Sequence, residues 1–148
     1  RTVVLREVQA EQRQLVFYTD GRSAKAAQLQ QQPQATLVLW SRDLGWQLRL
    51  RVQLSLQTSG LAVSSRWAQV KLTPSAMDYL APWPPGAPLQ ADGLEGAPPA
   101  TSPAPSRDSR GHFAVVTAQV QALDWLELHA EGHRRAAFDA QGARWLVP

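Results

Sequence analysis

Apolar side chains occupy every second position from Trp46 to Leu56, and polar side chains occupy the positions between them. Because successive side chains of a strand point to opposite faces, this period of two predicts a long strand over residues 46–57. Its apolar face, which includes Trp46, is predicted to lie in the core. Gln47, Arg49 and Arg51 share the polar face, where a ligand or a second subunit can meet them.

Shorter patterns predict the rest of the secondary structure. Apolar, β-branched and aromatic runs predict strands at residues 1–8, 15–19, 35–40, 112–121, 123–129, 134–138 and 144–147. Strong helix formers run from Ser23 to the residue before Pro33. Short helices are predicted at 64–70, capped by Ser64 or Ser65, and at 74–80, where Thr73 precedes Pro74 at the first helical position. Residues 82–111 hold most of the prolines, and we expect a mobile loop there.

Composition and charge narrow the classes of function. With 148 residues, 44% of them hydrophobic and 18% charged, the chain is typical of one globular domain over residues 1–148. A net charge of +3, without a basic and aromatic face, argues against a nucleic-acid partner. Cysteine is absent, which excludes thiol catalysis, zinc–thiolate sites and disulfides. His129 and His133 are four residues apart, a metal spacing on a helix, but their region is predicted as strand and turn and no carboxylate pair completes a site, so no metal site is predicted.

The ends and apolar runs of the chain bear on its location. No run approaches the roughly 18 apolar residues of a membrane span, and no basic-then-apolar leader is present. We therefore expect no membrane partner and a cytoplasmic protein. The sequence begins at Arg1, already inside a strand-like run and without Met, so we expect that further residues precede it.

Residues 15–25 join a strand pattern to a helix start that carries Ser23 and Lys25. The first N–H groups of a helix and the positive end of its dipole attract anions, so this junction can hold a phosphate. The ordinary alternative is a capping serine and a solvated lysine on a surface helix.

The blocks at residues 1–6, 15–25 and 40–49, in this order and at this spacing, resemble the pyridoxamine 5'-phosphate oxidase-like FMN-binding split-barrel family. The resemblance is close over residues 1–57, looser over 64–80 and 112–148, and absent between. It implies a mainly β fold, an antiparallel six-stranded Greek-key split β-barrel with a few short helices. It also implies a homodimer with FMN at the subunit interface. The helix and first strand that open the family fold would precede Arg1.

The resemblance also implies a set of site residues. Cofactor-binding positions are Arg1, Val3, Val4, Leu5, Tyr18, Thr19, Ser23, Lys25, Gln47 and Arg135, and substrate-binding positions are Arg6, Tyr79, His133 and Arg134. Arg1 alternatively is a surface residue at a frayed terminus, and Gln47 a solvent-facing strand residue. Ala24 and Ala137 stand where the family often has arginine, and Leu126, not Trp125, aligns with its tryptophan. The sequence thus resembles a divergent branch rather than the vitamin B6 oxidase itself.

The leading hypothesis is an FMN-dependent oxidoreductase that acts on an unidentified small molecule, with no residue that stands out as an obligatory acid or base. The alternative is a non-catalytic module that binds FMN or has lost it, favoured by Ala24 and Ala137. A third hypothesis is a basic-faced barrel that binds a protein or heme.

Overall fold

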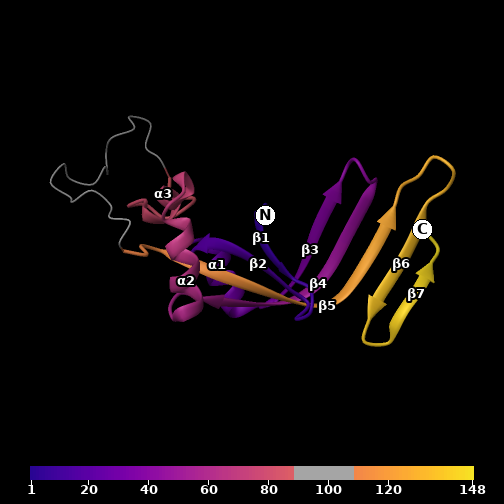
Figure 1. Ribbon diagram of the computed structural model, residues 1–148, viewed down its shortest axis with the longest axis horizontal. Helices are drawn as coiled ribbons and strands as arrows, with labels where there is room; N and C mark the ends of the chain where they lie inside the picture. Colours follow the sequence, from indigo (N-terminus) through magenta and orange to yellow (C-terminus); the bar gives the residue numbers. More distant parts are fainter. Residues whose placement is uncertain (89–108) are drawn as a thin grey trace. The chain divides into compact units, whose positions relative to one another are not determined.

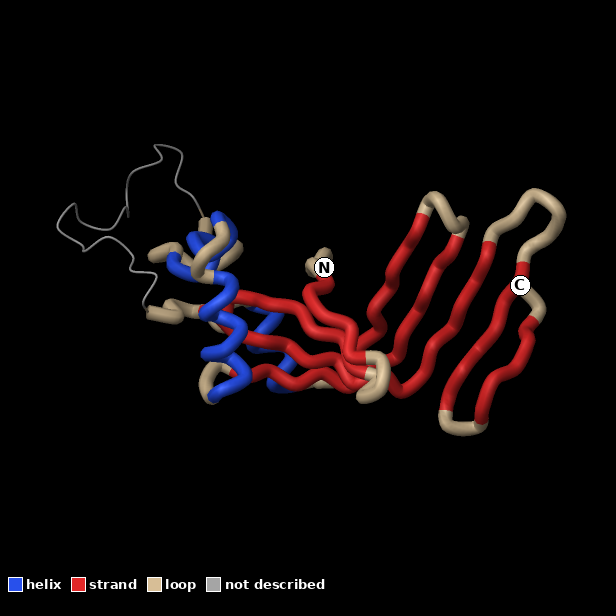
Figure 2. Tube along the Cα trace, viewed as in Figure 1, coloured by secondary structure: helices blue, strands red, loops and turns tan. Residues whose placement is uncertain are grey.

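The computed structural model describes residues 1–88 and 109–148. Figures 1 and 2 show how strands dominate them, with a few short helices. The strands are β1 (Leu5–Gln9), β2 (Gln14–Asp20), β3 (Gln34–Ser41), β4 (Trp46–Gln57), β5 (Phe113–Glu127), β6 (Arg134–Asp139) and β7 (Gly142–Leu146). The helices are α1 (Ala24–Gln31), α2 (Leu61–Val70), the 3-10 helix η1 (Pro74–Ala76) and α3 (Met77–Leu80). None of these helices is long and apolar enough to cross a membrane.

The strands form one sheet in the order β1-β2-β5-β4-β3, and the hairpin of β6 and β7 continues from β5. The pairs β3–β4, β5–β6 and β6–β7 are antiparallel. The predicted fold class, mainly β and antiparallel with a few short helices, is confirmed. The described residues contain seven strands rather than six. Gly142, with φ 109°, allows the turn after Asp139 through which β7 returns beside β6.

The chain divides into two compact units, each assembled from separate segments. The helical unit contains Arg1–Val4, Phe17–Gln31 and the described residues of Leu56–Val116. The sheet unit contains Leu5–Val16, Gln32–Ser55 and Thr117–Pro148. One domain over residues 1–148 stays a prediction.

An aromatic cluster forms the core of the helical unit. Phe113 is only 2% exposed, and its ring centroid lies 5.0 Å from those of Tyr18 and Tyr79 and 5.4 Å from that of Trp67. The two tyrosines meet Phe113 edge-on, an arrangement that places the positive edge of one ring against the negative face of another.

The core of the sheet unit confirms the alternation of the long strand. Leu50, Val52 and Leu54 are buried, while Arg49 and Arg51 are exposed. Trp46 is half-buried rather than fully buried, and its Nε1 donates a hydrogen bond of 3.1 Å to Glu127, the last residue of β5.

Two predicted strand boundaries are wrong. β1 begins at Leu5, so Arg1–Val4 lie outside the sheet: β-branched residues favour a strand only where a neighbour completes its hydrogen bonds. The strands predicted at 112–121 and 123–129 form one continuous strand, β5, because no glycine or proline interrupts the backbone between them.

The predicted helix is confirmed at α1, and at α2 the helix begins earlier than predicted. Ser23 caps α1, since its Oγ accepts a hydrogen bond from the Ala26 N–H at 3.3 Å. α2 starts at Leu61 after Gly60, and the hydroxyls of Ser64 and Ser65 donate to the backbone carbonyls of Gly60 and Ala62 instead of capping the helix.

Pro74 opens η1 as predicted, but the hydroxyl of Thr73 donates to the Val70 carbonyl at 2.7 Å instead of capping the new helix. In the predicted loop over 82–111, residues 82–88 and 109–111 contain no helix or strand. The rest of that prediction, residues 89–108, lies outside the described residues.

Candidate functional site

Two buried hydroxyl groups meet where β2 passes into α1. Thr19 and Ser23 are 5% and 8% exposed, and their Oγ atoms lie 3.3 Å apart. The backbone N–H groups that start a helix lie beside Ser23, because α1 begins at the next residue. A hydroxyl that accepts a hydrogen bond as a cap can still donate its own proton. This junction therefore offers several donors to one anion.

Two positive charges stand at the same place. Burial lowers the pKa of the Lys25 ammonium, and the charge of Arg1 lowers that pKa further, so the two cations lie close enough to repel each other. The Lys25 Nζ also lies 5.9 Å from the centroid of the Phe17 ring. No carboxylate within the described ranges 1–88 and 109–148 forms an ion pair with either cation. A bound anion would relieve this repulsion.

A neighbouring carboxylate, Asp20, is already neutralised. Its oxygens accept hydrogen bonds from the Arg22 N–H at 2.7 Å, Nε at 3.2 Å and Nη2 at 2.7 Å. The Arg22 guanidinium also donates to the backbone carbonyls of Ala81, Pro82 and Trp83, at 2.8, 3.0 and 3.3 Å. Arg22 is thus fully engaged and cannot replace the arginine that the resemblance led us to expect at position 24.

Sequence reasoning missed the role of Arg22. An aspartate at the end of a strand, followed by glycine, signals a turn in which the carboxylate accepts a nearby backbone N–H. The backbone carbonyls that accept from the Arg22 guanidinium lie some sixty residues further along the chain. No local sequence pattern predicts these contacts.

The helical unit brings together part of the predicted site. Arg1, Thr19, Ser23 and Lys25 gather at the start of α1, and Tyr18, half-buried, leads into it along β2. Val3 and Val4 follow Arg1 in the segment before β1, which is neither helix nor strand. Tyr79 is 8% exposed and packs in the Phe113 cluster, so its substrate role stays a prediction.

The sheet unit holds Leu5, Arg6, Gln47, His133, Arg134 and Arg135. Leu5 and Arg6 open β1, and half-buried Gln47 lies opposite Trp40 near the start of β4. His133 is exposed, and its Nδ1 accepts a hydrogen bond of 3.3 Å from the His129 N–H in the turn before β6. Within residues 1–88 and 109–148, no three His, Asp or Glu side chains form a group that could hold a metal ion.

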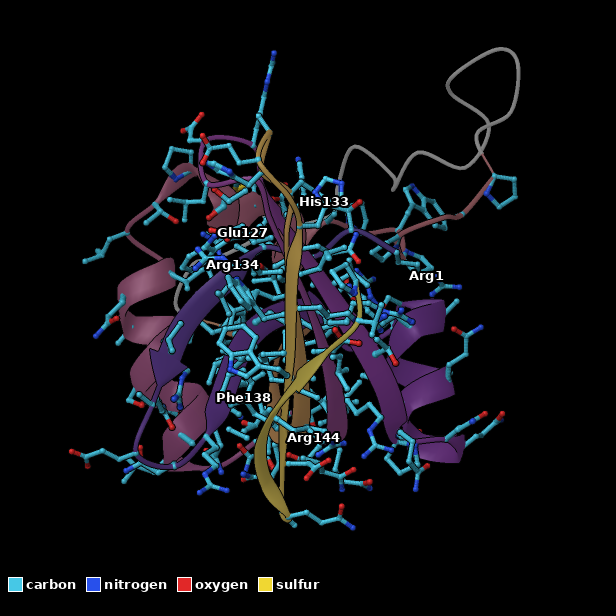
Figure 3. The ribbon with its side chains drawn as sticks, turned by 90° about the vertical axis from the view of Figure 1, so that its right-hand side faces the viewer. Arg1, Glu127, His133, Arg134, Phe138 and Arg144 are labelled. Atoms are coloured by element: carbon cyan, nitrogen blue, oxygen red, sulfur yellow. The ribbon has the colours of Figure 1, made fainter. Side chains whose placement is uncertain are left out.

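Arg134 and Arg135 point to opposite faces of β6, as expected for neighbours in a strand. Arg134 donates to Glu127, which also accepts from Trp46, and its guanidinium lies 5.8 Å from the centroid of the Trp125 ring. Figure 3 shows Arg134 and Glu127 side by side. The hydrogen bond from Arg134, together with that from Trp46, holds the pKa of the Glu127 carboxyl below its usual value.

Arg135 grips Asp124 with two parallel hydrogen bonds, Nε to Oδ1 at 3.0 Å and Nη2 to Oδ2 at 2.7 Å. This fork geometry holds the pKa of the Asp124 carboxyl below its usual value. Both arginines of the pair therefore have a carboxylate partner within the chain, which the sequence pattern did not reveal.

Part of the chain is similar in sequence to a known protein domain. Residues 1–58 match the sequence model of the pyridoxamine 5'-phosphate oxidase FMN-binding domain. A search of the curated proteins finds no match.

Two solved structures are similar over the whole chain. One is a pyridoxamine 5'-phosphate oxidase-related, FMN-binding protein from Nostoc punctiforme, with a TM-score of 0.71 and 28% identity over 100% of this chain and 80% of that one. The other is PhzG from Burkholderia lata in complex with tetrahydrophenazine-1-carboxylic acid, with a TM-score of 0.72 and 16% identity over 100% of this chain and 74% of that one. Residues 1–58 are therefore similar to the FMN-binding domain of pyridoxamine 5'-phosphate oxidase, and the chain as a whole has the fold of the pyridoxamine 5'-phosphate oxidase-related protein from Nostoc punctiforme.

Proposed function

We propose that this protein binds FMN and uses it as an oxidoreductase on a small molecule. The match of residues 1–58 to the FMN-binding domain of pyridoxamine 5'-phosphate oxidase supports FMN as the cofactor. The observation that carries the proposal is the gathering of Arg1, Lys25 and the hydroxyls of Thr19 and Ser23 at the start of α1.

The residues at this junction fit the phosphate of FMN. A phosphate monoester carries up to two negative charges and accepts several hydrogen bonds, and here two cations and two hydroxyls converge without a free carboxylate. The first N–H groups of α1 add donors aligned with the helix dipole. Ala24 contributes no guanidinium, so Lys25 carries more of the charge than in relatives with an arginine at that position.

FMN, when bound, supplies hydride or electron transfer to a substrate. The chain's own contribution is to bind and orient it. The main chain of Val3, Val4 and Leu5 and the amide of Gln47 offer donors and acceptors of the kind that a flavin ring system needs. No described side chain needs to act as an acid or base in this proposal.

We also propose that the protein is a homodimer with FMN at the subunit interface, as the sequence resemblance implies. Large apolar side chains on exposed strands support an interface: Val38 and Trp40 on the edge strand β3 are 61% and 54% exposed. Exposed apolar side chains on an edge strand favour association with a second chain.

An absorbance spectrum of the purified protein, followed by titration with FMN, tests the proposal. Flavin bands and saturable binding are expected, and reduction of the bound flavin by a nicotinamide distinguishes an oxidoreductase from a non-catalytic FMN-binding module. A protein that neither carries nor takes up FMN would refute the proposal.

A further inference from the structure

The polar face of β4 borders a second site within the sheet unit. A cavity of about 410 Å³ lies between this face and the hairpin of β6 and β7. Arg49 and Arg51 line it from β4, Asp124 from β5, and Ala137, Asp139 and Arg144 from the hairpin. Figure 3 looks onto the hairpin, with Phe138 and Arg144 labelled.

The hairpin register explains the open space. Asp124 pairs with Ala137 on the neighbouring strand, and Ala137 pairs with Arg144 on the next, so the three residues form one row across the sheet. Directly paired residues present their side chains on the same face. The methyl group of Ala137 therefore separates a carboxylate from a guanidinium and leaves room between them.

The carboxylates in the cavity are already occupied. Both oxygens of Asp124 accept hydrogen bonds from Arg135. Asp139 accepts one from the Arg144 Nη2 at 2.8 Å and one from the Gln141 N–H at 2.9 Å. Neither carboxylate has an oxygen without a donor.

Arg49 and Arg51 are left without an acceptor. The positive charge of Arg49 helps to lower the pKa of the Asp124 carboxyl. The positive charge of Arg51 helps to lower the pKa of the Asp139 carboxyl. Neither guanidinium hydrogen-bonds to any residue in the described parts of the chain. Counting Arg135 and Arg144, four guanidinium groups surround two carboxylates, so the cavity has an excess of positive charge.

We propose that this cavity binds a small molecule with one oxyacid group, a carboxylate or a phosphate, on an apolar body. Arg49 and Arg51 hold the anion, and the apolar side chains of Ala137 and Leu146, which share the face of Asp124 and Arg144, line the cavity for the rest of the ligand. Guanidinium groups suit this task because their planar donors match the oxygens of both anions.

Gln47 lies on the same face of β4, two residues before Arg49, a Cα separation of about 7 Å in a strand. If Gln47 contacts the flavin, as in the proposed function, the anion bound here is the substrate of the flavin, and this step rests on that function. The existence of the anion site does not.

Isothermal titration calorimetry of the full chain, with and without FMN, tests the site. The probes are benzoate, phenyl phosphate and the uncharged benzamide. We expect at least one of the two anions to bind at least tenfold more tightly than benzamide, and the comparison of the anions distinguishes a carboxylate site from a phosphate site.

The variant Arg49→Gln/Arg51→Gln should weaken binding of the preferred anion at least tenfold. Its matched control is Arg42→Gln, because Arg42 is an exposed arginine in the turn of the same β3–β4 hairpin and lies outside the cavity. Arg42→Gln should leave the affinity within twofold of that of the unmodified protein. Circular dichroism verifies that both variants fold.

Equal binding of benzamide and the anions, no binding at all, or the same affinity in the double variant would each overturn the inference. Anion binding to a protein that takes up no FMN would uphold the cavity site and refute the proposed function. FMN binding without anion binding would uphold the proposed function and refute the cavity site.

Discussion

At the scale of single residues, Lys25 has a position that is unfavourable without a ligand. It is half-buried beside the positive charge of Arg1, and both conditions disfavour its charged form. We expect Lys25→Ala to weaken FMN binding by at least about 1.5 kcal/mol, the scale of a hydrogen bond to a charged group. Fluorescence titration of FMN measures the change. Lys25→Arg keeps the charge and should retain most of the affinity, and unchanged affinity in the alanine variant would remove Lys25 from the site.

The lowered pKa of Lys25 also predicts a pH dependence. In the free protein this pKa lies below its usual value, and a bound phosphate dianion would raise it. Binding therefore takes up a proton between the two pKa values, and FMN affinity should fall as the pH rises through the pKa of the free protein. Titrations at a series of alkaline pH values measure this fall. In Lys25→Arg the fall should disappear, because a guanidinium stays charged over that range.

Some residues of the candidate site could be predicted from the sequence, and others could not. Ser23 and Lys25 follow from a local pattern, since a strand, a turn and a capped helix are close together in the chain. The gathering of Arg1 with Lys25 followed only from the family resemblance. The partners of Arg134 and Arg135, Glu127 and Asp124, depend on the β5–β6 register, which sequence alone did not define.

At the scale of elements, Arg22 fastens the turn before α1 to the segment that follows α3. The Asp20 side chain is only 3% exposed and has its ion pair with Arg22. Removing one partner of a buried pair leaves a charge without compensation, so Arg22→Ala should lower the free energy of unfolding by about 3 kcal/mol. Urea denaturation measures this loss.

The double variant Asp20→Asn/Arg22→Ala separates the buried charge from the hydrogen bonds to residues 81–83. It should be more stable than Arg22→Ala, because no carboxylate is then left without its cation. A double variant no more stable than Arg22→Ala would show that the carbonyl contacts, not the ion pair, dominate.

Elements with a strong internal period were predicted best. β4 has twelve residues in strict alternation, and its buried and exposed faces match the prediction because burial of one face dictates the pattern. The first residues of the chain were wrongly assigned to a strand, and α2 begins earlier than expected. In both places pairing and packing between distant segments, not local preference, define the boundary.

At the scale of the whole molecule, the exposed apolar side chains of β3 predict self-association. Light scattering at micromolar concentration should give the mass of a dimer, and Trp40→Glu should shift the population toward the monomer, since burial of a charge in an apolar interface is unfavourable. Leu61→Glu is the matched control, because Leu61 is 85% exposed at the start of α2 in the helical unit. A monomer for the unmodified protein would contradict this prediction.

The small side chain of Ala137 makes the proposed anion cavity a size filter. A cavity bounded by packed strands rejects a molecule that is too large through steric clash, but it loses only about 1–3 kcal/mol of binding for each methylene that a smaller molecule lacks. The protein should therefore accept a series of short acids and exclude bulky ones. Ala137→Leu should move this upper limit downward, so that in a graded series of carboxylates the largest ones lose binding first and the smallest keep theirs.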